Sequence, residues 1–337
     1  MHPSSKYVNM SNFTSLRGVN PILSTADEAL NAKLSTIRKG YYKDPFLSHF
    51  ASRSSSNKEN RNYSYSPIIR RGTYGRVCVM DTVISYAIDR VVKKSSQPEL
   101  QVIVLGAGKD SAYFRLRAGL LTDSRGGNSH VKNDCMPISL SWYEVDQPEI
   151  IDLKKSRLSH LPDFCMKENN NFKHYLIPFD LQGNIHELLS SIESEECYRF
   201  DKSKPTLVLM ECVRMYLRFS SSCEILAAIS KFVKDSMIAI YDPMLLEDAF
   251  GRIMRRNFIA MRFDVGEDSD LICQNTLKKS QATLEKFGFD MLLACDMLDA
   301  YQNIISSKEQ NQVSGPILNL QRLESNMLSR RQINARC

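Results

Sequence analysis

Short apolar runs alternate with longer amphipathic segments between residues 101 and 242. The apolar runs are rich in β-branched and aromatic residues and occupy positions 101–106, 139–146, 174–180, 206–212 and 236–242. In the segments between them, apolar side chains recur at helical spacing, as at Leu188, Leu189 and Ile192, and at Ile225, Leu226, Ile229 and Phe232. Strands that are apolar on both faces and alternate with helices are typical of a parallel sheet covered on both sides. The pattern therefore predicts an α/β fold built on a mostly parallel sheet.

Polar, aperiodic residues dominate positions 1–24, which predicts a flexible N-terminal tail. Helical spacing begins next, with Ser24 or Thr25 as the N-terminal cap and Gly40 as the stop. After a Ser/Asn-rich loop at 52–66, a second helix is expected to follow the motif RRGTYGR.

Three further segments lie beside or beyond this α/β region. Residues 120–138 interrupt the alternation and predict a loop insertion before the second strand. Residues 284–289 have the pattern of a helix end followed by a turn, and 290–301 are expected to be helical.

Composition places the chain among ordinary globular proteins. Of its 337 residues, 43% are hydrophobic and 24% are charged, and a chain of this length can bury a full core. No apolar run approaches the ~18 residues that a membrane span requires, and the first residues lack the apolar centre of a signal peptide. The 9 Cys and 6 His are scattered without metal-ligand or redox spacing. These features predict reduced thiols, no metal site, no membrane association and a cytoplasmic location.

The formal net charge of +6 is too small to indicate a nucleic-acid partner by itself. Basic residues do gather locally, in a segment that is expected to form an amphipathic helix. Its basic residues are Arg252, Arg255, Arg256 and Arg262, and its expected apolar side is Phe250, Ile253, Met254 and Phe258. The basic face is either a solvated surface or a docking site for an acidic partner.

The strongest candidate for a ligand site is the sequence VIVLGAGKDSAYFRL at 102–116. A buried strand runs into Gly106 and Gly108, and a helical pattern begins at once. Glycines at such a turn let a ligand approach the backbone beside the positive end of a helix. The dinucleotide fingerprint would need a third glycine where Ser111 stands, so that fingerprint is incomplete. The turn still favours a nucleoside ligand.

Acidic residues stand at the ends of the other predicted strands, at Asp146, Asp180, Glu211 and Asp242. Ligands of an open parallel sheet bind beyond the carboxyl ends of its strands. A carboxylate after the second strand can accept both hydroxyls of a ribose, and one after the third can receive an adenine amino group. Any one of them alone equally suits a turn or a helix cap, but together they favour a nucleoside site.

These features accompany a series of motifs that point to one family. The motifs follow one another between about residues 26 and 260: GYYKDPF, RRGTYGR, VIVLGAGKD, YEVD, a strand ending Phe-Asp-Leu, LVLMECVRMYL and DAFGRIM. In this combination the chain resembles the leucine carboxyl methyltransferases, which use S-adenosylmethionine to methylate the C-terminal leucine of the protein phosphatase 2A catalytic subunit. The resemblance implies a class I, Rossmann-like methyltransferase fold with helices on both faces of the sheet and an added helical lid.

The resemblance also implies residues for the amino-acid end of the cofactor. Lys33 and Arg76 would hold its carboxylate, and Glu211 would face its amino group. The charges agree with these roles, because a zwitterionic group needs a cation and an anion, and Arg76 and Glu211 supply one of each.

For the nucleoside end, the resemblance implies a second set of residues. Gly106 and Gly108 would admit the methionine and ribose portion, and Asp146 would bind the ribose hydroxyls. Asp180 and Leu181 would frame the adenine. The implied product is S-adenosylhomocysteine.

The acceptor in this reaction is a carboxylate, which is already ionised at neutral pH, because an α-carboxyl has a pKa of about 3.3–3.7. The chain therefore needs no general base and has to place the carboxylate in line with the methyl group and exclude water. We hypothesise that Arg71, Tyr74 and Tyr216 are the catalytic residues that line the acceptor pocket. Tyr74 and Tyr216 equally suit packing in an aromatic lid.

With this resemblance, the chain divides into a tail (1–24), a helical lid and cofactor clamp (25–95) and a methyltransferase core (96–337) with a substrate lid after residue 243. The insertion at 120–138 departs from the family pattern. The ending LESNMLSRRQINARC also departs from it and predicts a divergent or shortened last strand. The expected partner is the whole folded phosphatase subunit, because a tail alone offers little contact area. The protein is expected to be a monomer that binds no nucleic acid.

Three other functions are weighed against this one. The related methyltransferase that completes wybutosine in transfer RNA carries a long repeat-containing extension, which a chain of 337 residues is expected to lack. A catalytically silent phosphatase-binding protein would not need to keep Arg76, Asp146 and Glu211. A nicotinamide dehydrogenase is disfavoured by Ser111 in place of the third glycine.

Overall fold

The computed structural model of the chain describes residues 21–51, 65–122, 138–159, 161, 171–244, 249–260, 263, 266–274, 276–305 and 324–330. Most of the predicted tail, positions 52–64 of the Ser/Asn-rich loop, positions 123–137 of the insertion and Arg262 lie outside these residues. In the described part, no helix combines the length and the apolar character needed to cross a membrane.

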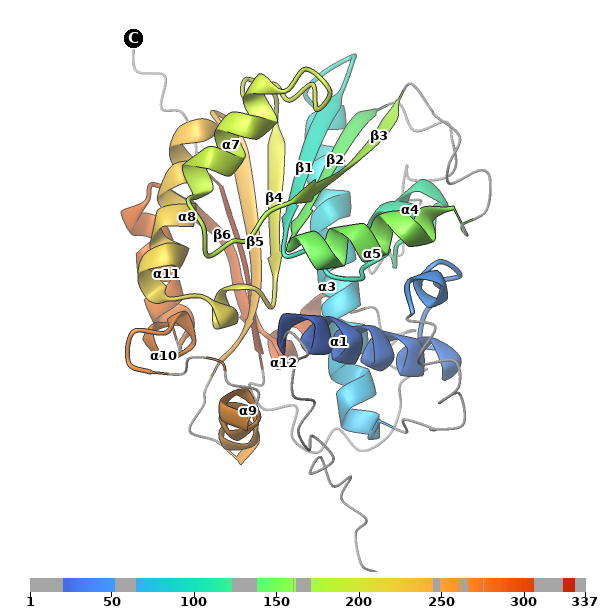
Figure 1. Cartoon of the computed structure of the whole chain (residues 1–337), viewed down its shortest axis with the longest axis vertical. Helices are drawn as coiled ribbons and strands as arrows, with labels where there is room; N and C mark the ends of the chain where they lie inside the picture. Colours follow the sequence, from blue (N-terminus) through green and yellow to red (C-terminus); the bar gives the residue numbers. More distant parts are fainter. Residues whose placement is uncertain are drawn as a thin grey trace, which may run out of the picture.

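A seven-stranded sheet forms the centre of the molecule (Figure 1). Its strands lie in the order β3-β2-β1-β4-β5-β7-β6, and β7 runs antiparallel to both of its neighbours. The bounds are β1 Glu99–Leu105, β2 Ser139–Asp146, β3 Phe172–Pro178, β4 Thr206–Glu211, β5 Ser236–Pro243, β6 Asp290–Asp296 and β7 Glu324–Arg330. The five predicted runs form the five neighbouring parallel strands, so the α/β, Rossmann-like fold is confirmed.

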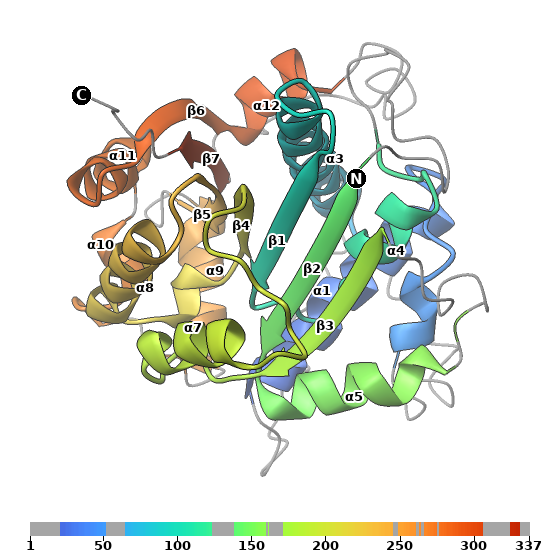
Figure 2. The same cartoon turned by 90° about the horizontal axis from the view of Figure 1, so that it is seen from above.

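Helices cover both faces of the sheet, as Figure 2 shows from above. One face is covered by α3 (Pro67–Val92), α4 (Ala112–Arg117) and the 3-10 turn η2 (Leu47–Phe50). The other is covered by α7 (Ile185–Ser194), α8 (Phe219–Phe232) and α11 (Leu277–Lys286). The remaining elements are α1 Pro21–Arg38, α5 Pro148–Leu158, η3 Arg214–Tyr216, α9 Ala249–Ala260, α10 Asp270–Cys273 and α12 Met297–Asn303.

Side-chain alternation along the central strands builds the two halves of the core. In β1, Leu100 and Val102 pack with the α3 side, whereas Ile103 and Leu105 pack with the α7 and α8 side. Successive side chains of a strand point to opposite faces, so a strand covered on both sides must be apolar at nearly every position. This requirement explains why the apolar runs marked the strands so closely.

Both N-terminal helices begin earlier than expected. Helix α1 begins at Pro21 rather than after a Ser24 or Thr25 cap, and α3 begins at Pro67 and includes the whole RRGTYGR motif. Proline suits a first helical turn, where its missing N–H leaves no bond unmade. The glycines of the motif suggest a loop, but Gly75 serves helix packing, since a Cβ there would lie 2.4 Å from Cε of Met297.

The expectation of a helix over 290–301 is wrong in its first half. Residues 290–296 form β6, and α12 begins only after Asp296, whose side chain accepts bonds from two backbone N–H groups of the first turn. A short apolar run suits a strand or a helix equally, and here the pairing with β7 decides. The helix end and turn expected at 284–289 are confirmed, with Gly288 at a φ of +80°.

Two further expectations concern the last strand and the basic helix. The last strand is not shortened, because β7 pairs along β5 from Pro243 to Met237 and along β6 on its other side. The basic amphipathic helix is confirmed as α9, but its buried side is narrower than expected. Phe258 is buried, whereas Ile253 is 46% exposed.

Candidate active site

The glycine turn after β1 carries two glycines with different surroundings. Both have left-handed backbone, with φ of +68° at Gly106 and +55° at Gly108. A Cβ on Gly106 would lie 2.5 Å from Cγ2 of Val213, whereas a Cβ on Gly108 would meet nothing within 4 Å. The first glycine is therefore required by the turn and its packing, and the second faces open space where a ligand can approach.

Asp146, at the end of β2, is fixed against this turn. Its Oδ2 accepts a hydrogen bond from the Gly108 N–H at 2.6 Å, and its Oδ1 accepts one from the Gln147 N–H at 2.7 Å. Burial raises the pKa of Asp146, and these two backbone bonds oppose the rise. The carboxylate is thus held at the turn with lone pairs left for a pair of ligand hydroxyls.

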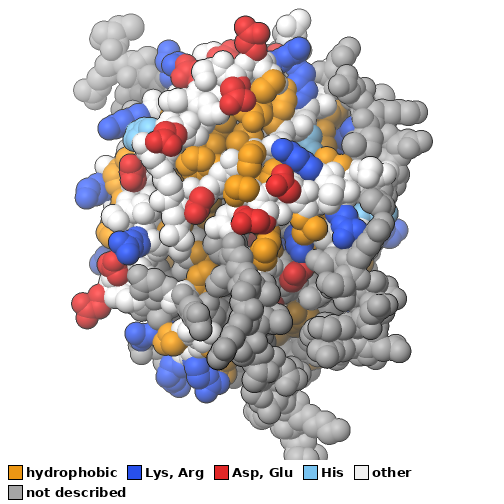
Figure 3. All heavy atoms as spheres, viewed as in Figure 1, with side chains coloured by type: hydrophobic (Ala, Val, Ile, Leu, Met, Phe, Trp, Pro, Cys, Tyr) orange, Lys and Arg blue, Asp and Glu red, His pale blue; other side chains and the backbone are white. Residues whose placement is uncertain are grey.

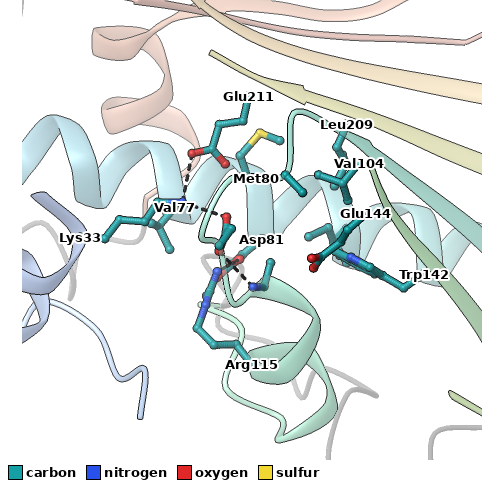
Figure 4. A pocket seen from close by; sticks show the side chains of 14 residues that line it. Lys33, Val77, Met80, Asp81, Val104, Arg115, Trp142, Glu144, Leu209 and Glu211 are labelled. Carbon is teal, nitrogen blue, oxygen red and sulfur yellow. Dashed lines mark hydrogen bonds and ion pairs between the residues drawn. The ribbon is translucent and has the colours of Figure 1, made fainter. Parts of the chain in front are cut away.

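Charged side chains converge where the sheet order reverses, beyond β1 and β4. Oε1 of Glu211 lies 2.9 Å from Nε of Arg76 and 3.1 Å from Nζ of Lys33, and Figure 4 shows Lys33 reaching Glu211 from α1. The same ammonium lies 2.8 Å from Oδ2 of Asp110. Burial alone would lower the pKa of Lys33, but Asp110 and Glu211 outweigh it and raise the pKa. Lys33 therefore stays charged at neutral pH.

A small cavity lies behind this charged centre, between α3 and the face of β1 and β4 (Figure 4). Its walls include apolar Val77, Met80 and Leu209, with Lys33 and Glu211 on one side. Its volume of about 30 Å³ has room for a water molecule but not for a nucleoside. The nucleoside end of a ligand would therefore have to lie outside this cavity, over Gly108 and the strand ends.

A buried ionic network supports the centre, and sequence reasoning missed it. The Oδ1 of Asp110 accepts a hydrogen bond from the Ala112 N–H at the start of α4, and its Oδ2 holds Lys33. Arg115, also on α4, binds both carboxylate oxygens of Asp81 on α3, at 2.5 and 2.9 Å, and its Nε lies 3.4 Å from Asp44. Burial alone would raise the pKa of Asp110, but Lys33 and Arg115 outweigh it and lower the pKa. The only sequence signal for this network is an Asp directly after a glycine turn that opens a helix.

Comparison with known proteins identifies the family. The profile of "Leucine carboxyl methyltransferase" matches residues 22–125 and 128–230, which contain the glycine turn, Asp146 and the three converging charges. The chain belongs to the leucine carboxyl methyltransferase family. This match confirms the resemblance drawn from the motifs.

Two curated proteins illustrate what the chain is similar to. The chain is 27% identical over 294 residues to Leucine carboxyl methyltransferase 1 homolog of Arabidopsis thaliana, which covers 87% of this chain and 81% of that protein. It is 26% identical over 314 residues to tRNA wybutosine-synthesizing protein 4 of Rattus norvegicus, which covers 88% of this chain. The chain spans 41% of the length of that second relative.

A solved structure supports the fold. The crystal structure of a duf574 family protein from Streptomyces avermitilis aligns with a TM-score of 0.52 at 11% identity, covering 90% of this chain and 97% of that one. At this identity the likeness concerns the fold alone.

S-adenosylmethionine is the cofactor of leucine carboxyl methyltransferases, and the residues of this chain fit it. The open space at Gly108 and the fixed carboxylate of Asp146 suit a ribose. Two cations, Lys33 and Arg76, and the anion Glu211 suit an amino-acid end that carries a carboxylate and an ammonium. In the described structure Glu211 pairs with both cations and Lys33 also pairs with Asp110, so each of these side chains has an opposite charge to exchange for a ligand group.

The other predicted nucleoside residues lie apart from the charged centre. Asp180 is exposed in the turn after β3, and its Oδ1 accepts a bond from the Gln182 N–H. Leu181 is buried on the α7 side of the core. Their contact with an adenine stays a prediction. Asp242, the remaining strand-end acid, is engaged elsewhere, in an ion pair of 2.7 Å with Arg214.

The three predicted acceptor residues have different surroundings. Burial raises the pKa of the Tyr216 hydroxyl, and the nearby Arg76 guanidinium opposes the rise. Tyr74 is 2% exposed and packs between Tyr41 and Tyr42. Their roles, like that of half-buried Arg71 on the same helix as Tyr74, stay predictions. Among the residues that the structure describes, no cluster of three or more His, Cys, Asp or Glu is placed to hold a metal ion.

Proposed function

We propose that this chain transfers a methyl group from S-adenosylmethionine to the α-carboxylate of the C-terminal leucine of the protein phosphatase 2A catalytic subunit, forming a methyl ester. The observation that carries the proposal is the convergence of Lys33, Arg76 and Glu211 beyond β1 and β4 in a chain of the leucine carboxyl methyltransferase family. Such a set of charges complements a zwitterionic amino-acid group, and the cofactor has one.

The residues of the chain then have to bind and orient rather than to move protons. S-adenosylmethionine supplies, when bound, an activated methyl group on a sulfonium sulfur. The acceptor carboxylate is ionised at neutral pH, and the Arg71 guanidinium would hold it by a charge-assisted bond. Burial raises the pKa of Tyr216, so its hydroxyl stays protonated and remains a hydrogen-bond donor. The lid segments at 25–95 and after 243 would exclude water from this pocket.

The whole folded phosphatase subunit is the partner that fits this reaction best. A C-terminal tail of a few residues buries far less than the area of about 1,200–2,000 Å² that specific protein complexes use. Contacts with the body of the substrate protein are therefore needed to select it among the many chains that end in leucine.

A second acceptor is supported by one observation, the 26% identity to tRNA wybutosine-synthesizing protein 4 over 88% of this chain. Methyl transfer to a modified guanosine of transfer RNA is therefore the competing candidate. The two candidates share the cofactor and differ in the acceptor, so a direct comparison of acceptors separates them.

The test pairs Asp146→Ala with Arg71→Ala, both checked for folding by circular dichroism. Calorimetric titration should show the S-adenosylmethionine Kd raised at least about tenfold in Asp146→Ala, because charge-assisted hydrogen bonds are worth about 1.5–3 kcal/mol each. Arg71→Ala should keep the wild-type Kd within about twofold and lose methyl transfer by about tenfold or more. Labelled transfer is measured to phosphatase with and without its last leucine, and to transfer RNA.

Each outcome has a distinct meaning. Transfer by the wild type to the leucine-ended phosphatase alone would support the proposal, and transfer to RNA alone would replace it by the second candidate. Cofactor binding with no transfer to either would indicate a catalytically silent binding protein. Unchanged binding in Asp146→Ala would mean that the ribose site is wrongly placed.

A further inference from the structure

Helix α9 presents an outward face that the proposed chemistry does not use. Arg252, Arg255, Arg256 and Ile259 are all exposed and stand at i, i+3, i+4 and i+7, so they share one side of the helix. On the other side, buried Phe258 packs with Met215 and Tyr216 of η3. We call the four exposed side chains the outer face of α9.

The outer face is basic and partly apolar. Helix α9 itself contains no acidic residue, and in the described part of the chain neither Arg255 nor Arg256 has an ion-pair partner. Like charges three and four residues apart repel one another, so the row weakens the isolated helix unless an anion lies against it. Ile259, at the C-terminal end of this row, is 57% exposed. Arginine is enriched at protein interfaces, and Ile259 adds an apolar side chain that a partner can cover.

The position of α9 connects this face with the candidate active site. The helix follows β5 and lies beyond the carboxyl ends of the strands, at the end of the sheet that α1 crosses (Figure 1). The ring of Phe258 meets the ring of Tyr216 edge to face, with 5.6 Å between the centroids. In the same view, Figure 3 shows basic side chains gathered at this end of the sheet, where Figure 1 draws α9. A protein whose chain end enters the proposed acceptor pocket from this end of the sheet would carry its folded body past the outer face.

We propose that the outer face of α9 docks an acidic surface on the folded body of the protein substrate, with Ile259 as its apolar contact. This inference rests on the proposed function, because it assigns the place where the methylated protein is held. The acidic occupant follows from charge complementarity with Arg255 and Arg256, and it agrees with the net charge of +6. The outer face selects the substrate and adds nothing to the methyl-transfer step.

The test uses the full chain and the folded phosphatase catalytic subunit, with labelled S-adenosylmethionine. Arg255→Glu combined with Arg256→Glu reverses the outer face. Lys231→Glu combined with Lys234→Glu makes the same charge change at the opposite end of the sheet, where α8 ends and both lysines are exposed. A third variant, Ile259→Ser, removes the apolar contact without changing charge.

The α9 double variant should raise KM for the phosphatase about tenfold or more, with kcat and the S-adenosylmethionine Kd within about twofold of wild type. Wild-type KM should rise between about 0.05 M and about 0.3 M salt, and the α9 double variant should lose most of that dependence. Ile259→Ser should raise KM and keep the wild-type salt dependence. The lysine double variant should match wild type throughout.

Four results would overturn the inference. Equal effects of the two double variants would show a general effect of net charge, and no effect of either would leave the outer face without a role. In both cases the wild type still methylates phosphatase, so the proposed function stands. A wild-type dimer that dissociates in the α9 double variant, seen by sedimentation, would assign the face to a second copy of this chain. Transfer to transfer RNA in place of phosphatase would reject the proposed function itself.

Discussion

At the residue scale, Gly106 and Gly108 are two positions of one turn with different physical duties. Both require the left-handed backbone that costs other residues about 1–2 kcal/mol. Only Gly106 also faces a rigid neighbour, Val213, at a distance that leaves no room for a Cβ. A substitution at each position therefore separates the stability of the turn from the space it offers to a ligand.

We expect Gly106→Ala to lower the free energy of unfolding by about 2–5 kcal/mol, the sum of backbone strain and overpacking. Gly108→Ala should cost only about 1–2 kcal/mol. It should still weaken S-adenosylmethionine binding, because its methyl group would occupy the open space over the turn. Urea unfolding and calorimetric titration measure the two effects. Equal stability of the two variants would show that the Val213 contact does not constrain the turn.

The residues of the site divide sharply in how far sequence could predict them. Gly108 and Asp146 could be proposed from the sequence because each stands at the end of a predicted strand, and their roles toward a cofactor stay predictions. The buried pair of Arg115 with Asp81 could not, because its partners are 34 positions apart and each looks like an ordinary surface charge on a helix. Packing of α3 against α4 brings them together, and no local pattern encodes that packing.

At the scale of elements, a second ionic cluster ties η3, the turn that carries Tyr216, to β5, α10 and α11. Arg214, which is fully buried, lies 2.7 Å from Asp242 and 3.5 Å from Asp270, and donates to Ser280. One arginine therefore faces two buried carboxylates. Burial raises the pKa of Asp270 to about 6, although Arg214 opposes the rise.

This pKa makes the cluster a source of pH-dependent stability. An Asp carboxyl has an ordinary pKa of 3.8. The stability that depends on the protonated Asp270 carboxyl is therefore fully present below about pH 4 and is lost as the pH rises through about 6. The difference between the two values corresponds to about 3 kcal/mol. Asp270→Asn should therefore raise the free energy of unfolding by about 1–3 kcal/mol at pH 8, with the gain vanishing near pH 4.

Chemical unfolding at several pH values measures this gain, and Asp268→Asn is the matched control because it makes the same change on an exposed neighbour. The control should follow wild type at every pH. A gain in Asp270→Asn that did not depend on pH would indicate that the carboxylate acts through its hydrogen bonds and not through its charge.

The elements could be predicted where strands are buried on both faces of the sheet, and they could not where strand pairing decides between a strand and a helix. The central strands were found because their two-sided cover demands continuous apolar residues. Helix α3 was placed too late because Gly72 and Gly75 suggest a loop, while Gly75 in fact admits Met297 of α12. The strand at 290–296 was missed because β6 lies at the edge of the described sheet and pairs there with β7 alone, about 30 positions later in the chain.

At the scale of the whole molecule, β7 has a larger part than its late position in the chain suggests. It lies between β5 and β6 rather than at an edge, so the sheet order makes it the connection of β6 to the other five strands. Helix α12 follows β6 directly and packs against α3 at Gly75, one residue before Arg76. The C-terminal strand thus supports the helix that carries one cation of the candidate site.

We therefore expect a chain that ends at residue 322 to lose far more than an edge strand. Each ladder hydrogen bond contributes about 0.5–1.5 kcal/mol, and β7 pairs along both sides, so their loss removes much of a total stability of about 5–15 kcal/mol. The opened edges of β5 and β6 would also promote association. Thermal unfolding and light scattering should show a low melting temperature and aggregation. A chain that ends at residue 331 keeps β7 and should match the full chain in both measurements. If the two truncations behaved alike, β7 would carry no share of the stability, and β6 with α12 would have to be held by their helical contacts alone.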